Sequence, residues 1–143
     1  MADFGAEVAE ALGILLLRST RAGLYRHLTE GLGLDEAAYP VLSGLARTGP
    51  RSAAALASEV GLDRSGVSRH ATRLEAAGLV RRRPDPSDGR AALLTLTEKG
   101  EHVVATMRTR LAGRMALALT DWPPGEAAAF ARGLRRLAET GPF

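Results

Sequence analysis

The sequence predicts a mainly α-helical protein with one small β-hairpin near its centre. Apolar residues recur at steps of three and four toward both ends of the chain, which is the period of a helix with one buried face. Two short runs, LVRRR (79–83) and AALLTLT (91–97), flank a segment rich in proline, aspartate and glycine, which is typical of two strands joined by a turn. The chain has 143 residues, 45% of them hydrophobic, and is expected to form a single domain over 1–143.

The N-terminal part is expected to contain two helices. The first is expected over residues 6–30, where apolar residues fall mostly at helical steps: Val8, Leu12, Leu15, Leu16, Leu24 and Leu28. Asp35 is expected to cap a second helix that runs to about Arg47. Pro40 lies inside this second helix, where its missing N–H removes a hydrogen bond unless the helix starts later or bends.

The centre is expected to hold a short helix, a tight turn and another helix. The short helix covers 52–60, and Gly61 favours the turn that follows it. Ala57 is small enough for the two helices to pack closely. Asp63 is expected to cap the second helix, which stops at Gly78. Its buried side is expected to consist of Val67, Ala71 and Leu74.

Two further helices are expected after the hairpin. Thr97 is expected to cap a long helix with an apolar stripe of Val104, Met107, Leu111 and Met115. The sequence TDWPPG then interrupts the chain, and a last helix carries Ala127, Phe130, Leu134 and Leu137. These stripes indicate packing, either inside a monomer core or against a second subunit.

Composition excludes several classes of function. There is no cysteine, so disulfides, thiolate metal sites and thiol redox switching are absent. The three histidines, His27, His70 and His102, have no metal-ligand spacing, and no phosphate loop or nucleophile motif indicates an enzyme. The acidic start and the short apolar run ALGILLL fit neither a signal peptide nor a membrane span. We therefore expect a cytoplasmic protein that is not an enzyme and has no cofactor.

The positive charge is concentrated in one segment. Residues 51–90 contain eight arginines and five acidic residues, a surplus of three that equals the net charge of +3 for the whole chain. The remaining residues carry as many acidic as basic side chains. This distribution is expected where one face meets a polyanion, although a merely solvated surface is the alternative.

A short helix, a glycine turn, a second helix and a basic hairpin together form the layout of a winged helix-turn-helix. In that layout the second helix enters the major groove of DNA. Its outward face would present Arg64, Ser65, Ser68, Arg69, Thr72 and Arg73. Arginine can donate two hydrogen bonds to guanine, and hydroxyls suit phosphates or bases. The alternatives are a solvated face with arginines in ion pairs, or a protein-interaction module, in which this face would tend to be apolar or acidic.

The central segment resembles the MarR-type transcriptional regulators. The resemblance lies in LASEVGLDRSGVSRHATRLEAAGLVRRRPDPSDGRAALLTLTEKG, which contains a Leu-Glu pair, a glycine, an Asp-x-Arg hairpin and Leu-Thr-x-x-Gly. The matching residues are Leu74, Glu75, Gly78, Leu79, Val80, Arg82, Arg83, Asp88, Arg90, Leu96, Thr97 and Gly100. Two positions depart from the pattern: Gly89 stands where a basic residue is common, and His70 where an apolar one is.

The resemblance implies a role for each part of the chain. Residues 35–97 would form the DNA-binding lobe, and 5–30 and 98–140 a helical dimerisation region. Arg90 would enter the minor groove, Asp88 would hold the hairpin turn, and Arg82 and Arg83 would meet phosphates. The protein would be a homodimeric repressor on a pseudopalindromic operator in double-stranded DNA.

The resemblance also implies a small aromatic or anionic effector, bound between the dimerisation helices and the DNA-binding lobe, which lowers DNA affinity. Arg18, Tyr25 and His102 lie on helices that could face such a cleft. Nothing in their spacing distinguishes ligand contacts from packing.

Overall fold

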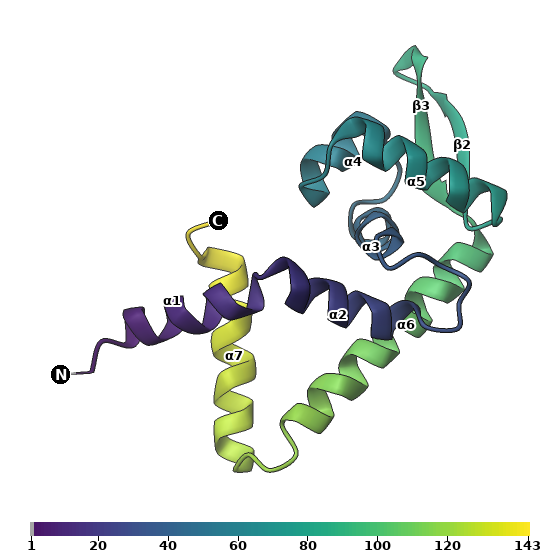
Figure 1. The fold of residues 1–143 in the computed structure, drawn as a ribbon. Helices are drawn as coiled ribbons and strands as arrows, with labels where there is room; N and C mark the ends of the chain where they lie inside the picture. Colours follow the sequence, from purple (N-terminus) through teal and green to yellow (C-terminus); the bar gives the residue numbers. More distant parts are fainter. Residues whose placement is uncertain (1) are drawn as a thin grey trace. The chain divides into compact units, whose positions relative to one another are not determined.

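A computed structural model describes residues 2–143, and in this part of the chain seven helices accompany a small antiparallel sheet (Figure 1). The predicted fold class, mainly α with a β-hairpin, is confirmed. The elements are α1 (Phe4–Leu15), α2 (Arg18–Thr29), α3 (Ala38–Thr48), β1 (Arg51–Ser52), α4 (Ala53–Val60), α5 (Arg64–Ala76), β2 (Val80–Asp85), β3 (Asp88–Leu96), α6 (Glu98–Ala118) and α7 (Pro124–Thr140). They form two compact units, Met1–Arg108 and Thr109–Phe143.

The single helix expected over 6–30 is wrong, because the structure has two helices there, α1 and α2. Leu17 has a non-helical ψ of 136° and is the N-cap residue of α2. Where α1 ends, the carbonyl oxygen of Ile14 accepts from the hydroxyl of Thr20 at 2.9 Å and from the backbone N–H of Leu17 at 3.2 Å. No glycine or proline lies at this break, and apolar residues continue across it. The sequence pattern therefore did not indicate that the helix ends here.

The start of α3 also differs from the expectation. Asp35 does not cap the helix, since its carboxylate accepts from the backbone N–H of Ala37 at 3.0 Å in a turn that precedes Ala38. Pro40 therefore falls in the first turn of α3, where backbone N–H groups have no partner within the helix. The later start removes the misfit that Pro40 posed.

The helix-turn-helix is formed by α4 and α5, as predicted. Ser52 caps α4 by accepting from Ala55 N–H at 3.2 Å, and Asp63 caps α5 by accepting from Gly66 N–H at 3.2 Å. Gly61 between them has φ of 71°, a left-handed conformation that glycine adopts without strain. The core of the first compact unit draws on residues outside α4 and α5 as well. Its buried residues include Leu28, Val41, Leu42, Leu45, Leu56, Val67, Ala71, Leu74, Leu94, Val104 and Met107.

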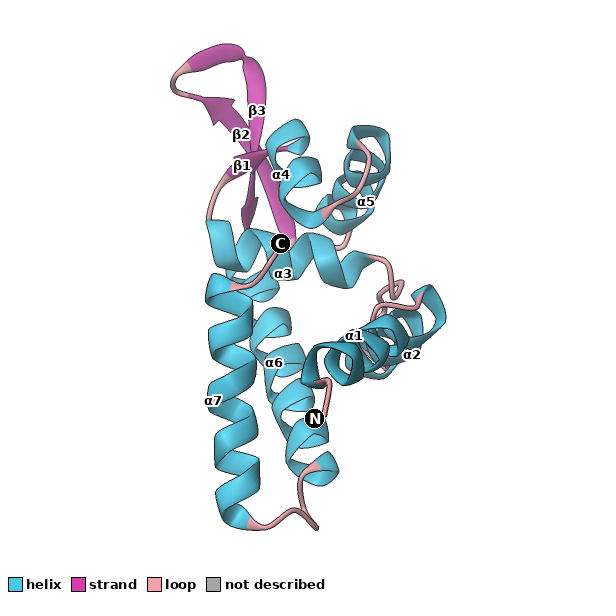
Figure 2. Cartoon of the chain, turned by 90° about the vertical axis from the view of Figure 1, so that its left-hand side faces the viewer, coloured by secondary structure: helices cyan, strands magenta, loops and turns pink. Residues whose placement is uncertain are grey.

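The sheet has the strand order β1-β3-β2 and its hairpin is longer than predicted. Pairing continues through Pro84 with Ala92 and Asp85 with Asp88, so the turn is shorter than the segment between 83 and 91 that the sequence predicts. Proline is tolerated there because β2 is an edge strand. The short strand β1 was missed, since it contains only two residues. Figure 2 shows the hairpin extending beyond α4 and α5.

Helix α6 begins where the sequence predicts, whereas α7 begins at Pro124, inside the segment TDWPPG that was expected to precede it. Thr97 caps α6, because its hydroxyl oxygen accepts from Gly100 N–H at 3.1 Å. Val104 and Met107 are buried, whereas Met115 further along α6 is 46% exposed. None of the residues of α7, all of which the structure describes, is buried, and Trp122 packs beside Phe130 with ring centroids 5.2 Å apart. Across residues 2–143, no helix is both long and apolar enough to cross a membrane.

Candidate nucleic-acid interface

The outward face of α5 is polar and basic. Val67, Ala71 and Leu74 are buried, which fixes the rotation of the helix about its axis. All six residues expected on the opposite face are exposed: Arg64, Ser65, Ser68, Arg69, Thr72 and Arg73. His70 lies between the two faces and is partly buried. The helix therefore presents polar and basic side chains to solvent from Arg64 to Arg73.

The first turn of α5 is held by Asp63. The hydroxyl of Ser65 donates to the Asp63 carboxylate at 2.6 Å, and Gly66 N–H donates to its other oxygen. Together with the positive charge of Arg69, these bonds lower the pKa of Asp63, and the Ser65 bond contributes most. A Cβ at Gly66 would overlap the Asp63 carboxylate, so a larger residue there would require the Asp63 side chain to shift. Ser65 thus acts in the cap as well as on the exposed face.

The turn of the hairpin is held by two aspartates. Asp88 accepts from Arg90 N–H at 3.0 Å, and Asp85 accepts from both the backbone N–H and the hydroxyl of Ser87 at 2.9 and 2.7 Å. The Ser87 bonds lower the pKa of Asp85. The sequence reasoning missed Asp85 and Ser87, although an Asp-x-Ser spacing in a turn is a known signal for such bonds. Arg90 is exposed beside this ordered turn.

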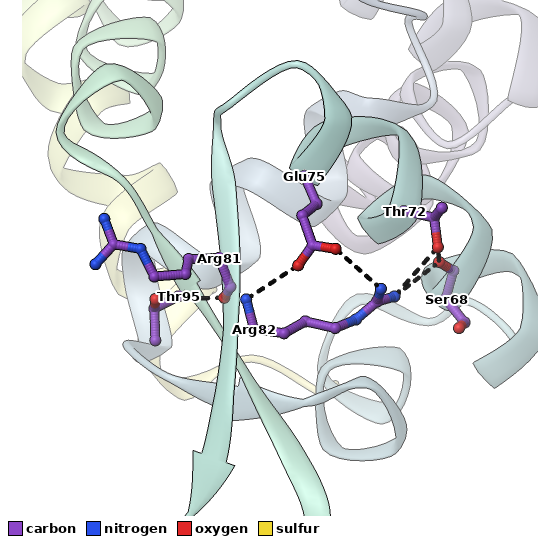
Figure 3. A network of polar contacts seen from close by, with 6 residues as sticks. All are labelled: Ser68, Thr72, Glu75, Arg81, Arg82 and Thr95. Carbon is purple, nitrogen blue, oxygen red and sulfur yellow. Dashed lines mark hydrogen bonds and ion pairs between the residues drawn. The ribbon is translucent and has the colours of Figure 1, made fainter.

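The three consecutive arginines of β2 do not share one face. Side chains alternate along a strand, so Arg81 and Arg83 point away from Arg82. Arg81 and Arg83 are exposed, whereas Arg82 lies against α5, as Figure 3 shows for Arg81 and Arg82. The alternation of side chains along a strand is enough to separate Arg82 from its neighbours, and it adds Arg81 to the candidate surface.

Arg82 makes four contacts with α5. Its backbone N–H donates to Glu75 Oε2 at 3.2 Å, and its guanidinium lies 3.5 Å from Glu75 Oε1. Nη2 of the same guanidinium donates to the carbonyl oxygen of Ser68 at 3.4 Å and to Thr72 Oγ1 at 3.3 Å (Figure 3). The expected phosphate contact of Arg82 therefore competes with partners inside the protein.

A second link joins α5 to the loop before α3. Arg73 Nη1 lies 3.8 Å from Asp35 Oδ2, with both side chains largely exposed. Asp35 also lines an open hollow of about 590 Å³, together with Arg26, His27, Glu30 and Glu36 among others. Of the three residues considered for an effector, Arg18, Tyr25 and His102, none is among those described as lining this hollow. Tyr25 instead stacks on Tyr39 at 4.6 Å between ring centroids.

Similarity to known proteins supports the same architecture. The model of the MarR family matches residues 32–91. YxaD of Bacillus subtilis (strain 168), an uncharacterized HTH-type transcriptional regulator, is 35% identical over 104 residues, which cover 73% of each chain. The structure of a MarR family protein from Bacillus stearothermophilus has a TM-score of 0.77 at 25% identity, over 96% of this chain and 97% of that one. A MarR transcriptional regulator from Methanosarcina mazei Go1 also has a TM-score of 0.77, at 20% identity, over 95% of this chain and 96% of that one.

Proposed function

This chain belongs to the MarR family of transcriptional regulators, and from that membership we propose that it is a sequence-specific repressor. It binds a pseudopalindromic operator in duplex DNA as a homodimer, in the cytoplasm, and a small aromatic or anionic effector releases it. The observation that carries this proposal is the exposed face of α5, which is basic and polar and is followed directly by a basic hairpin.

The exposed face of α5 suits the major groove of DNA. Arg64, Arg69 and Arg73 can donate in pairs to guanine or singly to phosphates, and the Ser68 hydroxyl can bond to either. The Asp63 cap orders the first turn, whose residues reach base edges in helix-turn-helix proteins. This chemistry favours DNA over a protein partner, for which an apolar or acidic face would be expected.

The hairpin suits the neighbouring phosphates and minor groove. Arg83 is exposed on β2, and Arg90 is exposed beside the turn that Asp88 holds. A narrow minor groove concentrates negative potential, so an arginine can enter it without reading a particular base. Gly89 leaves the tip of the hairpin without a second basic side chain.

A homodimer would cover apolar surface that is exposed in the single chain. In the first unit Ile14 and Leu16 are 58% and 59% exposed, and in the second unit Leu117 is 77% exposed. Folded monomers rarely leave many large apolar side chains in water, and such surface marks interaction sites. We assign residues 5–30 and 98–140 to dimerisation and 35–97 to DNA binding.

The function is tested by binding of the purified protein to the duplex upstream of its own gene. Fluorescence anisotropy should show a complex at moderate salt that a large excess of unrelated duplex does not displace. In cell-free transcription from that duplex, the protein should lower transcript yield. A complex that unrelated DNA abolishes on every duplex tried, including those recovered from a random pool, would instead favour the protein-interaction module.

A further inference from the structure

We propose that Arg82 fixes the position of the hairpin relative to α5 through Glu75, in place of the phosphate contact expected from the sequence. Arg82 is thus a positioning residue for DNA binding. The proposal rests on the proposed function, because it concerns how two DNA-contacting elements are held at one spacing.

The first support is the backbone contact. β2 is an edge strand, so N–H groups on its outer side have no partner in the sheet. Glu75 Oε2 accepts from the backbone N–H of Arg82 at 3.2 Å, which attaches the strand itself to α5. A carboxylate that bonds to a backbone N–H positions the main chain, whatever the neighbouring side chain does.

The second support is the guanidinium, which contacts three residues of α5. It lies 3.5 Å from Glu75 Oε1 and donates to Ser68 O and Thr72 Oγ1. These three positions are spaced by four and three residues, so they lie along one side of the helix. The planar arrangement of donors in arginine suits several fixed acceptors at once, which the single ammonium of lysine does not.

The third support is the use of Thr72. Its hydroxyl donates to the carbonyl oxygen of Ser68 at 3.0 Å and accepts from Arg82. The proton and one acceptor site of this hydroxyl are therefore already engaged. Thr72 belongs to the network and is not a free reader of bases, although it lies on the exposed side of α5.

The fourth support combines two observations. Arg82 is less exposed than the neighbouring arginines, and its partner Glu75 is negatively charged. The side chain of Arg82 is 32% exposed, whereas Arg81 and Arg83 are exposed on the other face of the strand. Glu75 brings a negative charge close to a surface that meets phosphates, which by itself weakens DNA binding. An acid at this position is useful if its bonds to Arg82 set the geometry of the hairpin.

The test compares Arg82→Lys and Glu75→Ala with the matched control Arg47→Lys. Affinity for the operator duplex is measured by anisotropy at several salt concentrations, and folding is checked by circular dichroism. Arg82→Lys keeps the charge and loses the planar donors, so we expect binding to weaken about tenfold with an unchanged salt slope. Arg47 is exposed on α3 and is assigned no DNA contact, so Arg47→Lys should bind within about twofold of wild type.

Glu75→Ala gives the sharpest contrast, because simple electrostatics and the proposed network predict opposite changes in DNA affinity. It makes the protein more positive, so simple electrostatics predicts tighter binding, whereas loss of the network predicts binding weaker by about fivefold or more. Tighter binding by Glu75→Ala, or wild-type affinity in Arg82→Lys, would overturn the proposal. So would an Arg82→Gln variant whose salt slope falls by about 0.9, the value for one lost phosphate contact.

Amide hydrogen exchange in the free protein separates this proposal from the proposed function. Glu75→Ala should speed exchange at the Arg82 amide by about tenfold or more, with exchange at the buried Val67 unchanged. Unchanged exchange at Arg82 would overturn the network even if DNA binds. Failure of the wild type to bind any specific duplex would overturn the repressor function, and the exchange result would still decide whether Glu75 holds the strand.

Discussion

Replacing Gly100 with alanine should destabilise the protein, although alanine is the better helix former. Gly100 lies in the first turn of α6, and a Cβ there would overlap the backbone carbonyl oxygen of Leu79. The same Cβ would lie 3.0 Å from the Leu79 carbonyl carbon and 3.3 Å from Leu96 Cδ2. This close approach places the start of α6 directly against the residue where the hairpin begins.

The magnitude follows from what has to move. Leu79 O accepts from Thr97 N–H at 3.0 Å, so the carbonyl cannot turn away without loss of a hydrogen bond worth about 1 kcal/mol. Overpacking a filled site costs about 1–3 kcal/mol, and the gain in helix propensity offsets at most about 1 kcal/mol. We therefore expect Gly100→Ala to lower the free energy of unfolding by about 2 kcal/mol.

The matched control is Gly113→Ala in the same helix, where a Cβ would meet nothing within 4 Å. It should raise the free energy of unfolding by about 0.5–1 kcal/mol, because helix propensity improves and the Cβ meets no atom of its own chain. Both variants would be unfolded in urea at one protein concentration and followed by circular dichroism. Equal or increased stability in Gly100→Ala would refute the reasoning about this contact.

Three further predictions concern the hairpin, the dimer and acid stability. Arg90→Ala should weaken operator binding and lower the salt slope by about 0.9, whereas unchanged affinity at matched salt would exclude a role for Arg90. Leu134 is 50% exposed on α7, so Leu134→Glu should give a monomer mass by light scattering if this face lies in the dimer; a variant that stays dimeric would contradict that assignment. Hydrogen bonds lower the pKa of Asp85 in the folded state, so its contribution to stability is present above about pH 4 and lost as the pH falls through the folded-state pKa. Asp85→Asn should therefore lose less stability than wild type between about pH 5 and pH 2, and equal losses would show that this carboxylate has no such role.

Local signals in the sequence were enough to predict the helix-turn-helix. Asp63 caps α5, Gly61 has the left-handed conformation of the turn, and Thr97 caps α6, each as expected from residue type and spacing. These features depend on bonds between residues a few positions apart. The exposed face of α5 followed from its buried face, because the period of a helix fixes one once the other is known.

Features that depend on distant contacts were not predictable in the same way. The break between α1 and α2 has no glycine or proline, and β1 exists only because Arg51 and Ser52 pair with β3. The partners of Arg82 lie 7 to 14 residues away in sequence and come together only when the hairpin folds onto α5. Strand alternation separates Arg82 from Arg81 and Arg83, but it does not tell which of the two sides faces α5.

The most direct test of the account is a hydroxyl-radical footprint of the protein on its operator duplex. The account predicts two protected regions about one helical turn apart and related by a two-fold axis, with further protection in the minor groove outside them where Arg90 would lie. Arg90→Ala should remove the outer protection and leave the inner regions. A single protected region, or uniform weak protection along the duplex, would contradict binding by a dimer that places α5 in the major groove.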